Sequence, residues 1–389
     1  MAFSMDILRS SHVSAVRFSD GGGNRSRSFS TRRFNIRANL PFPKQNAKYH
    51  KELEAAIDVV HSACRLCVQV KSGLFSTDGK VLEKIDQTPV TVADFGVQAL
   101  ISLELSKLFP SIPLVAEEDS AFVRSRNLAG TVFDAVRAEV SSNSKTLTQD
   151  DVLNAIDRGG KDAFVFGPKP ATYWLLDPID GTRGFLKDNS ALYVVGLSLV
   201  VEGETEIGIM GCPNWQEGVS GKPSAEVEED REALPRSGIM MIAHKGHGTW
   251  TKTLNSKPES SDSQTWDSLP LSATLDATSN ANDVGSNQVL LLVVCCGSLI
   301  KHFMVASGRA SVFIQRKKEK TIMAWDHAVG MLCVHEAGGK VTDWEGTEMD
   351  LAADEISRRS IFPSGGILAT NGNLHNKIVQ LISDQAAVV

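Results

Sequence analysis

The hydrophobic positions along the chain predict a mixture of helices and short buried strands. Residues Tyr49 to Lys71 carry apolar side chains at the three- and four-residue spacing of an amphipathic helix. A second helix is predicted from Asp94 to about Leu108, with Thr91 or Asp94 as its cap. Residues Thr146 to Asp157 predict a third helix, in which Thr148 is the N-cap and acidic residues fill the first turn.

Short apolar runs, bounded by glycine, proline or polar residues, predict the strands. Two further helices are predicted, from Gly297 to about Ser307 and from Trp325 to Glu336. The mostly polar residues 121–172 are interpreted as an insert before the central strand, and residues 251–287 as a long surface excursion. The predicted strands are Ile112–Ala116, a strand that ends with Trp174–Leu176, Leu192–Val201, Thr205–Met210, Ile239–His244, Val289–Cys295, Ser311–Gln315, Val341–Trp344 and Ile367–Asn371.

The most informative stretch is Tyr173 to Phe185, in which an apolar run ends and two aspartates follow. Pro178 has no N–H to donate to a sheet, so we expect the strand to end there. Asp177 and Asp180 flank this proline, and Gly181 then allows the chain to turn. Two carboxylates beside a turn with free N–H groups suit a divalent cation together with a phosphate. A tight turn with solvated aspartates is the alternative, and this short pattern does not exclude it.

Three other acidic positions stand at the boundaries of predicted elements. Glu117 begins a run of three acids directly after a buried strand, where like charges repel unless a cation or solvent separates them. Asp94 lies near a helix N-terminus, and Asp326 falls in the first turn of the last helix described above. Capping and solvation explain each acid separately, whereas a metal site explains them together with the aspartate pair.

The composition limits the class of protein to which the chain can belong and the kinds of partner that it can bind. The chain has 389 residues, 42% of them hydrophobic and 22% charged, which is ordinary for a globular protein of two domains or two lobes. No apolar run is long enough to cross a bilayer, so we expect no membrane partner. A net charge of −6 argues against a nucleic-acid polymer as the main partner. A small anion remains compatible with that charge, because a metal ion can supply local positive charge.

Residues 1–40 differ in composition from the rest of the chain. They contain seven arginines, many serines and only two acids, Asp6 and Asp20. That composition is typical of an organellar transit peptide, and a disordered basic tail is the alternative. We expect residues 1–45 to form this segment.

The cysteines do not form a metal-binding pattern. Cys64 and Cys67 form a C-x-x-C within the first predicted helix. No second C-x-x-C and no nearby histidine pair completes a zinc site. We therefore interpret these cysteines as buried structural thiols, with a redox switch as the alternative.

Three motifs in order resemble those of a known family of phosphatases. Together they resemble the inositol monophosphatase superfamily of metal-dependent, lithium-sensitive enzymes, and the resemblance extends from Tyr49 to Ile382. The motifs are Glu117-Glu118-Asp119, then Asp177-Pro178-Ile179-Asp180-Gly181-Thr182, and then Trp325-Asp326-His327-Ala328 followed by Glu336-Ala337-Gly338-Gly339.

Further features are similar to the 3′(2′),5′-bisphosphate nucleotidase branch of that superfamily. They are the run Thr91-Val92-Ala93-Asp94, the long insert that carries Leu147-Thr148-x-Asp150-Asp151-Val152-Leu153-x-Ala155-Ile156-Asp157-x-Gly159, the pair Ser298-x-x-Lys301, and His327. With the arginine-rich leader, the chain resembles plant organellar members of this branch.

The resemblance implies the fold and its division. We expect an α+β fold, a layered α-β-α-β-α sandwich of two lobes. Residues 46–212 would form an N-terminal α+β lobe that carries most of the metal ligands. Residues 213–389 would form a C-terminal α/β lobe that carries the nucleotide contacts and Asp326.

The resemblance also implies a site for two or three Mg²⁺ ions. Magnesium prefers hard oxygen ligands, and two ions about 3.5–4 Å apart would activate a water and neutralise the charge on the phosphate and leaving oxygens. The implied ligands are Glu117, Asp177, Asp180, Asp326 and the backbone carbonyl of Ile179.

Catalytic roles follow from the same resemblance. Asp94 and Thr182 would orient and deprotonate the water that attacks the phosphorus in line. The N–H groups after Asp180, at Gly181 and Thr182, would hold the transferred phosphate.

The implied substrate is a small bisphosphorylated nucleotide, 3′-phosphoadenosine 5′-phosphate (PAP), which would yield AMP and phosphate, with PAPS as a further substrate. This activity belongs to sulfur metabolism. The expected substrate contacts are Gly181, Thr182, His244, Ser298, Lys301, Arg316 and Asp326.

Two positions depart from the pattern of the family. Arg183 stands where a lysine is frequent. An arginine that contacts nucleotide in the family would fall near Gln315, with Arg316 beside it.

Other functions, assemblies and locations remain open at this stage. The metal motif does not set the leaving group, so an inositol phosphate phosphatase is one alternative. A catalytically idle regulator that binds nucleotide is the alternative of another class, because residues in a site carry function and a fold does not. We expect a monomer, with a dimer as the alternative, located in the mitochondrion, with the chloroplast stroma as the alternative.

Overall fold

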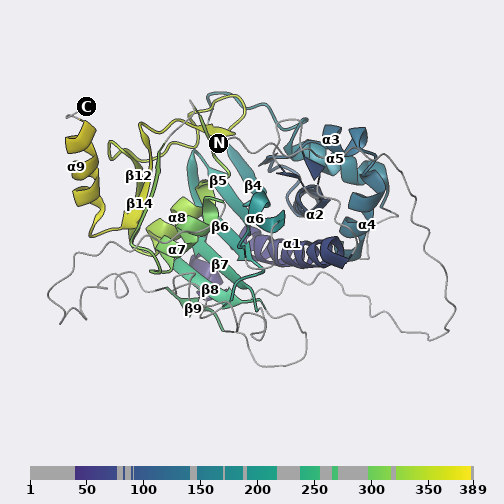
Figure 1. Ribbon diagram of the computed structural model, residues 1–389, viewed down its shortest axis with the longest axis horizontal. Helices are drawn as coiled ribbons and strands as arrows, with labels where there is room; N and C mark the ends of the chain where they lie inside the picture. The colour runs from purple at the N-terminus through teal and green to yellow at the C-terminus, as the bar shows by residue number, and fades with distance from the viewer. Residues whose placement is uncertain are drawn as a thin grey trace, which may run out of the picture.

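Helices and sheets alternate in five layers across the part of the chain that the structure describes (Figure 1). This computed structural model describes residues 40–76, 82–83, 89–90, 92–140, 147–169, 171–186, 191–216, 237–254, 265–269, 297–316 and 321–386. The order helix–sheet–helix–sheet–helix confirms the predicted fold class. Most of the predicted transit peptide and the predicted strand at residues 289–295 lie outside the described residues.

The larger sheet has seven strands in the order β3-β4-β5-β6-β7-β8-β9. β3 (Leu114–Ala116) is parallel to β4 (Thr172–Asp180), and all other neighbours are antiparallel. β6 pairs with β7, so the sheet continues across the expected lobe boundary between residues 212 and 213. The other strands are β5 (Val194–Val201), β6 (Glu204–Cys212), β7 (Ile239–His244), β8 (Gly248–Thr253) and β9 (Asp267–Ser268).

Part of the predicted surface excursion at residues 251–287 belongs to this sheet. β8 extends to Thr253, and β9 pairs with it at the edge. The prediction was wrong for these residues because β8 is short and polar, with Thr249 and Thr251 buried where an apolar side chain would be expected. Residues 255–264 and 270–287 lie outside the described part of the chain.

Two pairs of helices cover the two faces of the larger sheet. On one face, α1 (His50–Ser76) packs on β5 and β6, and α2 (Val92–Leu108) packs on β4. On the other face, α7 (Leu299–Ala306) packs on β5, and α8 (Ala328–Glu336) packs on β5 to β8. α7 and α8 therefore form the middle layer of the molecule.

The predicted insert at residues 121–172 is a group of packed helices, of which the sequence predicted only the last. α3 (Ser120–Ser125), α4 (Ala129–Glu139) and α5 (Gln149–Gly159) precede β4, and α4 and α5 pack on α2. Val132 and Val136, one turn apart on α4, are fully buried. Thr148 caps α5 in a reciprocal capping box with Asp151, which confirms the predicted cap.

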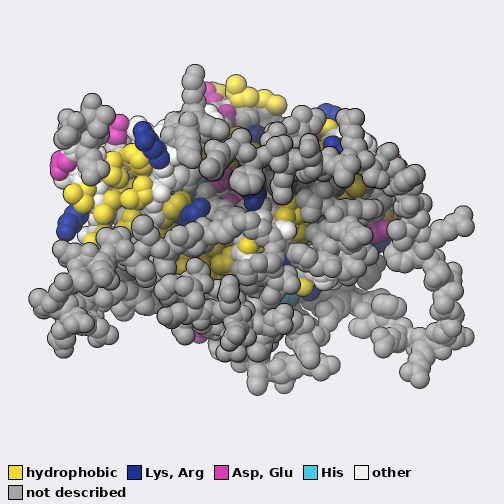
Figure 2. Space-filling model, in the orientation of Figure 1, with side chains coloured by type: hydrophobic (Ala, Val, Ile, Leu, Met, Phe, Trp, Pro, Cys, Tyr) yellow, Lys and Arg dark blue, Asp and Glu magenta, His cyan; other side chains and the backbone are white. Residues whose placement is uncertain are grey.

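A second, smaller sheet lies beyond the middle layer. It has the order β10-β14-β12, and all of its pairs are antiparallel. α7 and α8 contact one side of it, and α9 (His375–Ala386) contacts β14 from the outside. On the face shown in Figure 2, hydrophobic side chains gather over this end of the molecule, around α9, β12 and β14. The strands are β10 (Val312–Arg316), β12 (Gly339–Asp343) and β14 (Gly366–Asn371).

No helix among the described residues is both long and apolar enough to cross a membrane.

Minor elements complete the described structure. The minor elements are η1 (Lys44–Asn46), α6 (Thr182–Leu186), the pair β1 (Leu82–Glu83) and β2 (Pro89–Val90), and the pair β11 (Ile322–Met323) and β13 (Ser360–Ile361).

The alternation of side chains along β4 divides the interior into two cores. Trp174 and Leu176 are buried in the core shared with α1 and α2. Tyr173 and Leu175 are buried in the core shared with α7, α8 and the smaller sheet. β4 is therefore covered on both faces, which explains its continuous apolar sequence.

The described cysteines are free thiols in the interior. Cys64 and Cys67 are buried on α1, as predicted, and neither forms a disulfide. Burial raises the pKa of Cys64 to about 12 and that of Cys67 well above its usual value. Protonated, buried thiols of this kind are poor nucleophiles.

Candidate active site

A β-bulge at the end of β4 turns Asp177 and Asp180 to one side of the sheet. The strand was predicted to end at Pro178, and this prediction was wrong. β4 continues to Asp180. Asp177 pairs with Gly196 and Asp180 with Val194, so β4 has one more residue than β5 in this interval. Pro178 is tolerated because a bulge leaves its extra residue without a ladder hydrogen bond. In a regular strand, residues three apart would face opposite sides, and the extra residue removes that difference.

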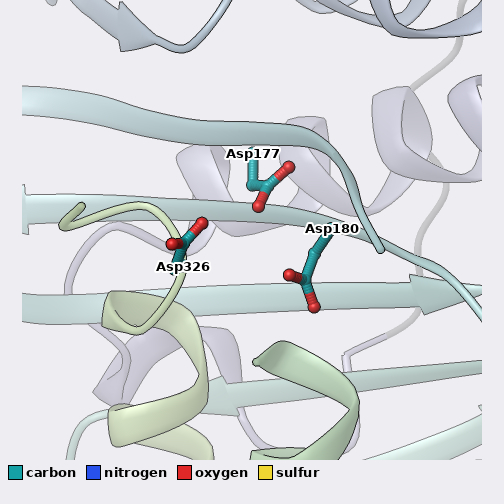
Figure 3. A group of neighbouring side chains, drawn as sticks. All are labelled: Asp177, Asp180 and Asp326. Carbon is teal, nitrogen blue, oxygen red and sulfur yellow. The ribbon is translucent and has the colours of Figure 1, made fainter. Parts of the chain in front are cut away.

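Asp326 completes a cluster of three carboxylates, which we call the acidic cluster. Each of Asp177, Asp180 and Asp326 offers one oxygen, and these oxygens all lie within 4.8 Å of one another. Figure 3 shows the three side chains turned toward one another, two from β4 and one from the turn before α8. Asp326 was predicted to lie in the first turn of this helix, and that prediction was wrong. The helix begins at Ala328 with His327 as its N-cap, so Asp326 stands before the cap.

Burial and mutual repulsion raise the pKa of every carboxyl group in the cluster. Burial, followed by the charges of Asp180, Glu117, Asp326 and Asp94, raises the pKa of Asp177 well above its usual range. Burial raises the pKa of Asp180 to about 6, although backbone N–H groups stabilise its charged form. Burial and the neighbouring acids raise the pKa of Asp326 to about 8. Full ionisation of the cluster at neutral pH is therefore unfavourable without a cation.

The donor set of the cluster fits a hard divalent cation. All three side chains offer carboxylate oxygens, the ligand type that Mg²⁺ prefers. Oδ1 of Asp177 is buried and has no hydrogen-bond partner within the described residues. A buried charged oxygen is rarely left unpaired unless it coordinates a metal.

Of the three consecutive acids after β3, Glu117 acts electrostatically on the cluster. Its charge raises the pKa of Asp177, Asp180 and Asp326. The backbone N–H and carbonyl of buried Glu118 bond the side chain of Gln98, at 2.9 and 2.6 Å. The side chain of Asp119 caps α3 by accepting from the N–H of Ala121 at 2.8 Å.

Asp94 and Thr182 lie on two helices that begin beside the cluster. Asp94 is buried in the first turn of α2, as predicted, and its charge raises the pKa of Asp177. Thr182 is the first residue of α6, and its hydroxyl donates to the carbonyl oxygen of Ile179 at 3.1 Å. The hydroxyl therefore touches the backbone carbonyl that was predicted to be a metal ligand. Gly181 precedes it with φ +90°, a conformation that favours glycine.

The N-terminus of α7 donates directly to the acidic cluster. The backbone N–H of Ser298 donates to Oδ1 of Asp180 at 2.9 Å, and that of Leu299 donates to Oδ2 at 2.7 Å. Gly297, which precedes them, has φ +71°, and a side chain there would overlap the carboxylate of Asp180. From the sequence, Gly297 is predicted only to begin a helix. Its position directly before Ser298-x-x-Lys301 is the signal that would have identified Gly297 as part of the site.

Lys301 and Ser298 lie in the first turn of α7, partly exposed. Nζ of Lys301 donates to the carbonyl of Gly297 at 2.8 Å and lies 5.7 Å from the centre of the Phe313 ring. The hydroxyl of Ser298 donates to the side chain of Gln315 at 3.3 Å. Arg316, the next residue on β10, is exposed, and side chains alternate along a strand. Gln315, not Arg316, is therefore the β10 residue that contacts α7 at this point.

His244 has a set of partners separate from those of the cluster. It is buried at the end of β7, and its ring nitrogens lie 2.9 Å from the carbonyl of Lys245 and 2.6 Å from that of Lys48. Its ring also contacts Phe42 and His247. No contact recorded among the described residues joins His244 to the acidic cluster, so its role toward a nucleotide stays a prediction. Arg183 is exposed on α6.

The five-layered fold and the acidic cluster have the form of a metal-dependent phosphatase. The chain belongs to the inositol monophosphatase family, whose sequence profile matches residues 48–387. The family is metal-dependent, and the acidic cluster is a group that can hold a metal ion.

Particular relatives lie in the branch that the motifs predicted. The chain is 56% identical over 394 residues to an Arabidopsis thaliana protein that bears the name of a mitochondrial 3′(2′),5′-bisphosphate nucleotidase, covering 95% of this chain and 96% of that protein. It is 35% identical over 371 residues to a second Arabidopsis thaliana protein, named a 3′,5′-bisphosphate nucleotidase, covering 84% and 95%. A solved inositol monophosphatase structure from Thermotoga maritima is 18% identical, with a TM-score of 0.49 and coverage of 86% and 97%. The two Arabidopsis thaliana relatives confirm the similarity to the bisphosphate nucleotidase branch.

Proposed function

We propose that this protein hydrolyses the 3′-phosphate of PAP to give AMP and phosphate, with Mg²⁺ as its cofactor. Three carboxylates, two of them buried and one half-buried, have oxygens within 4.8 Å of one another beside the N-terminus of α7, and this observation carries the proposal. Membership of a phosphatase family and similarity to proteins named as bisphosphate nucleotidases support the reaction and the class of substrate.

The chain would hold Mg²⁺ through the acidic cluster, joined by Glu117 and the carbonyl oxygen of Ile179. Bound Mg²⁺ would neutralise the charge of the transferred phosphate and of the leaving 3′-oxygen. Asp180 would stay fixed during the reaction, because two backbone N–H groups of α7 hold its two oxygens.

The remaining residues would act on the water and on the phosphate. Asp94 would accept the proton of the attacking water, and Thr182 would orient that water while its hydroxyl contacts Ile179. The backbone N–H groups of Gly181 and Thr182 would hold the transferred phosphate. These roles require the water to lie opposite the leaving oxygen, between α2 and α6.

The first turn of α7 would select a substrate with a second phosphate. The charge of Lys301 acts on the carboxylate of Asp180, its Nζ donates to the carbonyl of Gly297, and the hydroxyl of Ser298 is one turn away. The 5′-phosphate of PAP is the group that such a pair would bind. The name of the Arabidopsis relative supports the mitochondrion as the location.

A phosphate-release panel tests this proposal. The purified protein would be assayed with PAP, PAPS, inositol 1-phosphate and inositol 1,4-bisphosphate, each with Mg²⁺, with a chelator, and with Mg²⁺ plus Li⁺. We expect Mg²⁺-dependent release that is fastest from PAP and is inhibited by Li⁺. Faster release from an inositol phosphate would overturn the substrate assignment. Nucleotide binding without any release would indicate a regulator instead of an enzyme.

A further inference from the structure

Two buried histidines join the helices that flank the acidic cluster. His302 lies on α7 and His327 is the N-cap of α8, and both are completely buried. Nε2 of His302 lies 3.0 Å from Nδ1 of His327, so one of these nitrogens donates its hydrogen to the other. Burial lowers the pKa of His302 well below its usual value and that of His327 to about 3, so both rings are neutral. One N–H···N bond is what two neutral imidazoles can share.

The ring of His302 is held in one position by its neighbours. Gly330 on α8 faces it, and a methyl group at that glycine would lie 2.5 Å from Cβ and Cγ of His302. The ring of Phe313 on β10 meets it edge-on, with centroids 5.2 Å apart. The contact with His327 therefore depends on a close approach of α7 and α8 that only glycine permits.

Packing alone does not account for this pair. The outer nitrogens, Nδ1 of His302 and Nε2 of His327, are buried and have no hydrogen-bond partner among the described residues. A buried polar atom without a partner costs stability, and two apolar side chains of similar shape would avoid that cost. The pair is therefore expected to do something that apolar side chains would not.

The position of the pair in the fold indicates what that is. His327 directly follows Asp326 in the chain. α7 holds Asp180 through two N–H groups in its first turn, and one turn later it holds His327. One helix thus contacts both Asp180 and the residue next to Asp326, although these two acids come from separate parts of the sequence.

We propose that His302 is a positioning residue that fixes Asp326 against Asp180 through its hydrogen bond to His327. It touches neither substrate nor metal, and it acts by holding the turn before α8 at the distance that a cation requires. This inference rests on the proposed function only in that Asp326 is taken to bind Mg²⁺.

Titration of Mg²⁺ into the metal-free protein, followed by calorimetry without any substrate, tests the inference. We expect His302→Leu to weaken Mg²⁺ binding about 10- to 100-fold, the range found when groups that orient metal ligands are removed. His302→Gln, which can place an amide near the position of Nε2, should restore most of that loss. Gly330→Ala, which displaces the ring but keeps His302, should weaken binding as well.

Phe303→Leu is the matched control. Phe303 lies beside His302 on α7, is equally buried and packs on Trp215, away from the histidine pair. If this variant weakens Mg²⁺ binding as much as His302→Leu does, general loosening of α7 is the cause and the proposal is wrong. Unchanged Mg²⁺ affinity in His302→Leu would also overturn it.

The kinetic readout separates this inference from the proposed function. In His302→Leu, raising Mg²⁺ should recover most of the lost phosphate release, which a merely structural defect would not allow. A protein that hydrolyses no nucleotide, yet shows the expected order of Mg²⁺ affinities, would refute the proposed substrate and leave His302 as the positioning residue. Failure of the unaltered protein to bind Mg²⁺ would overturn both.

Discussion

Two regions that meet at Asp180 have opposite electrostatic character. In the acidic cluster Asp177 and Asp180 are buried and Asp326 is half-buried. The carboxyl groups repel one another, and one oxygen of Asp177 has no hydrogen-bond partner within the described residues. The N-terminal segment of α7, from Gly297 to Lys301, has its polar groups paired. Its N–H groups donate to Asp180, and Nζ of Lys301 donates to Gly297.

The difference shows how the fold divides two tasks within one site. Without a cation, repulsion between the carboxylates makes their ionisation unfavourable. Cation binding is favoured because it relieves that repulsion. The polar groups of the α7 segment already have hydrogen-bond partners, so the segment can position Asp180 and present Lys301 without reorganising. Four predictions follow, each of which would weaken or sharpen this contrast.

Loss of a cluster carboxylate should have the largest effect. Asp177→Asn should lower phosphate release by about a thousandfold or more, because the substitution removes a charged ligand at the reacting phosphate. Thermal unfolding of the metal-free variant should occur at the same temperature or higher, since one of several repelling charges is gone. Asp119→Asn is the control, because Asp119 is exposed at the end of the neighbouring strand and asparagine can also cap a helix. Near-normal turnover by Asp177→Asn would refute the ligand assignment.

Loss of the α7 charge should have a smaller, substrate-dependent effect. Lys301→Ala should lower kcat/KM for PAP about 10- to 100-fold, the equivalent of one hydrogen bond to a charged group. The same substitution should change kcat/KM for inositol 1-phosphate less than about threefold, because that substrate has no second phosphate. Lys245→Ala, on a surface lysine paired with Glu204, is the control. Equal losses on both substrates would contradict the role given to Lys301.

A methyl group at the junction of the two regions should disturb both. Gly297→Ala should destabilise the protein more than Gly246→Ala does, although both glycines have positive φ, +71° and +79°. The conformational cost of about 1–2 kcal/mol is common to both sites. Only at Gly297 would the methyl group meet a neighbour, the carboxylate of Asp180, whereas Gly246 has nothing within 4 Å. Denaturant unfolding of the two variants measures the difference, and equal destabilisation would show that the contact is easily relieved.

A change of pH should have the smallest effect, a shift of a few degrees in the unfolding temperature. The folded-state pKa values of Asp180 and Asp326, about 6 and about 8, lie above the ordinary value of 3.8. A raised folded-state pKa means that the folded chain retains protons that the unfolded chain releases. This stabilisation is complete below about pH 4 and is lost as the pH rises through 6 and 8.

Magnesium should reverse that loss. Mg²⁺ competes with protons for the same oxygens, so the increase in unfolding temperature caused by Mg²⁺ should be larger at pH 8.5 than at pH 6, by about 2–4 °C. Asp326→Asn should reduce this pH dependence, because it removes the group with the pKa near 8. An equal increase at both pH values would show that the cluster is not where Mg²⁺ exchanges with protons.

Local patterns in the sequence were enough to predict much of the fold. The helix of α1, the capping box of Thr148 and the strands β5, β6 and β7 follow from periodicity and capping chemistry over a few residues. The motifs also predicted that Asp177, Asp180 and Asp326 share a site, and the structure brings them together. In the insert before β4, α5 was predicted but α4 was not. The buried residues of α4 are few and stand among many polar ones, and their burial depends on the neighbouring helix α2.

The amino-acid sequence specifies which chemical groups are available and which local elements carry them. How these groups face one another depends on the tertiary structure. The bulge that turns Asp177 and Asp180 to one side depends on the register with β5, and the N–H groups that hold Asp180 come from a helix more than a hundred residues later. The contact between His302 and His327 needs Gly330 on a separate helix. Such contacts join residues distant in the chain, and only the packing of the layers brings them within hydrogen-bond distance.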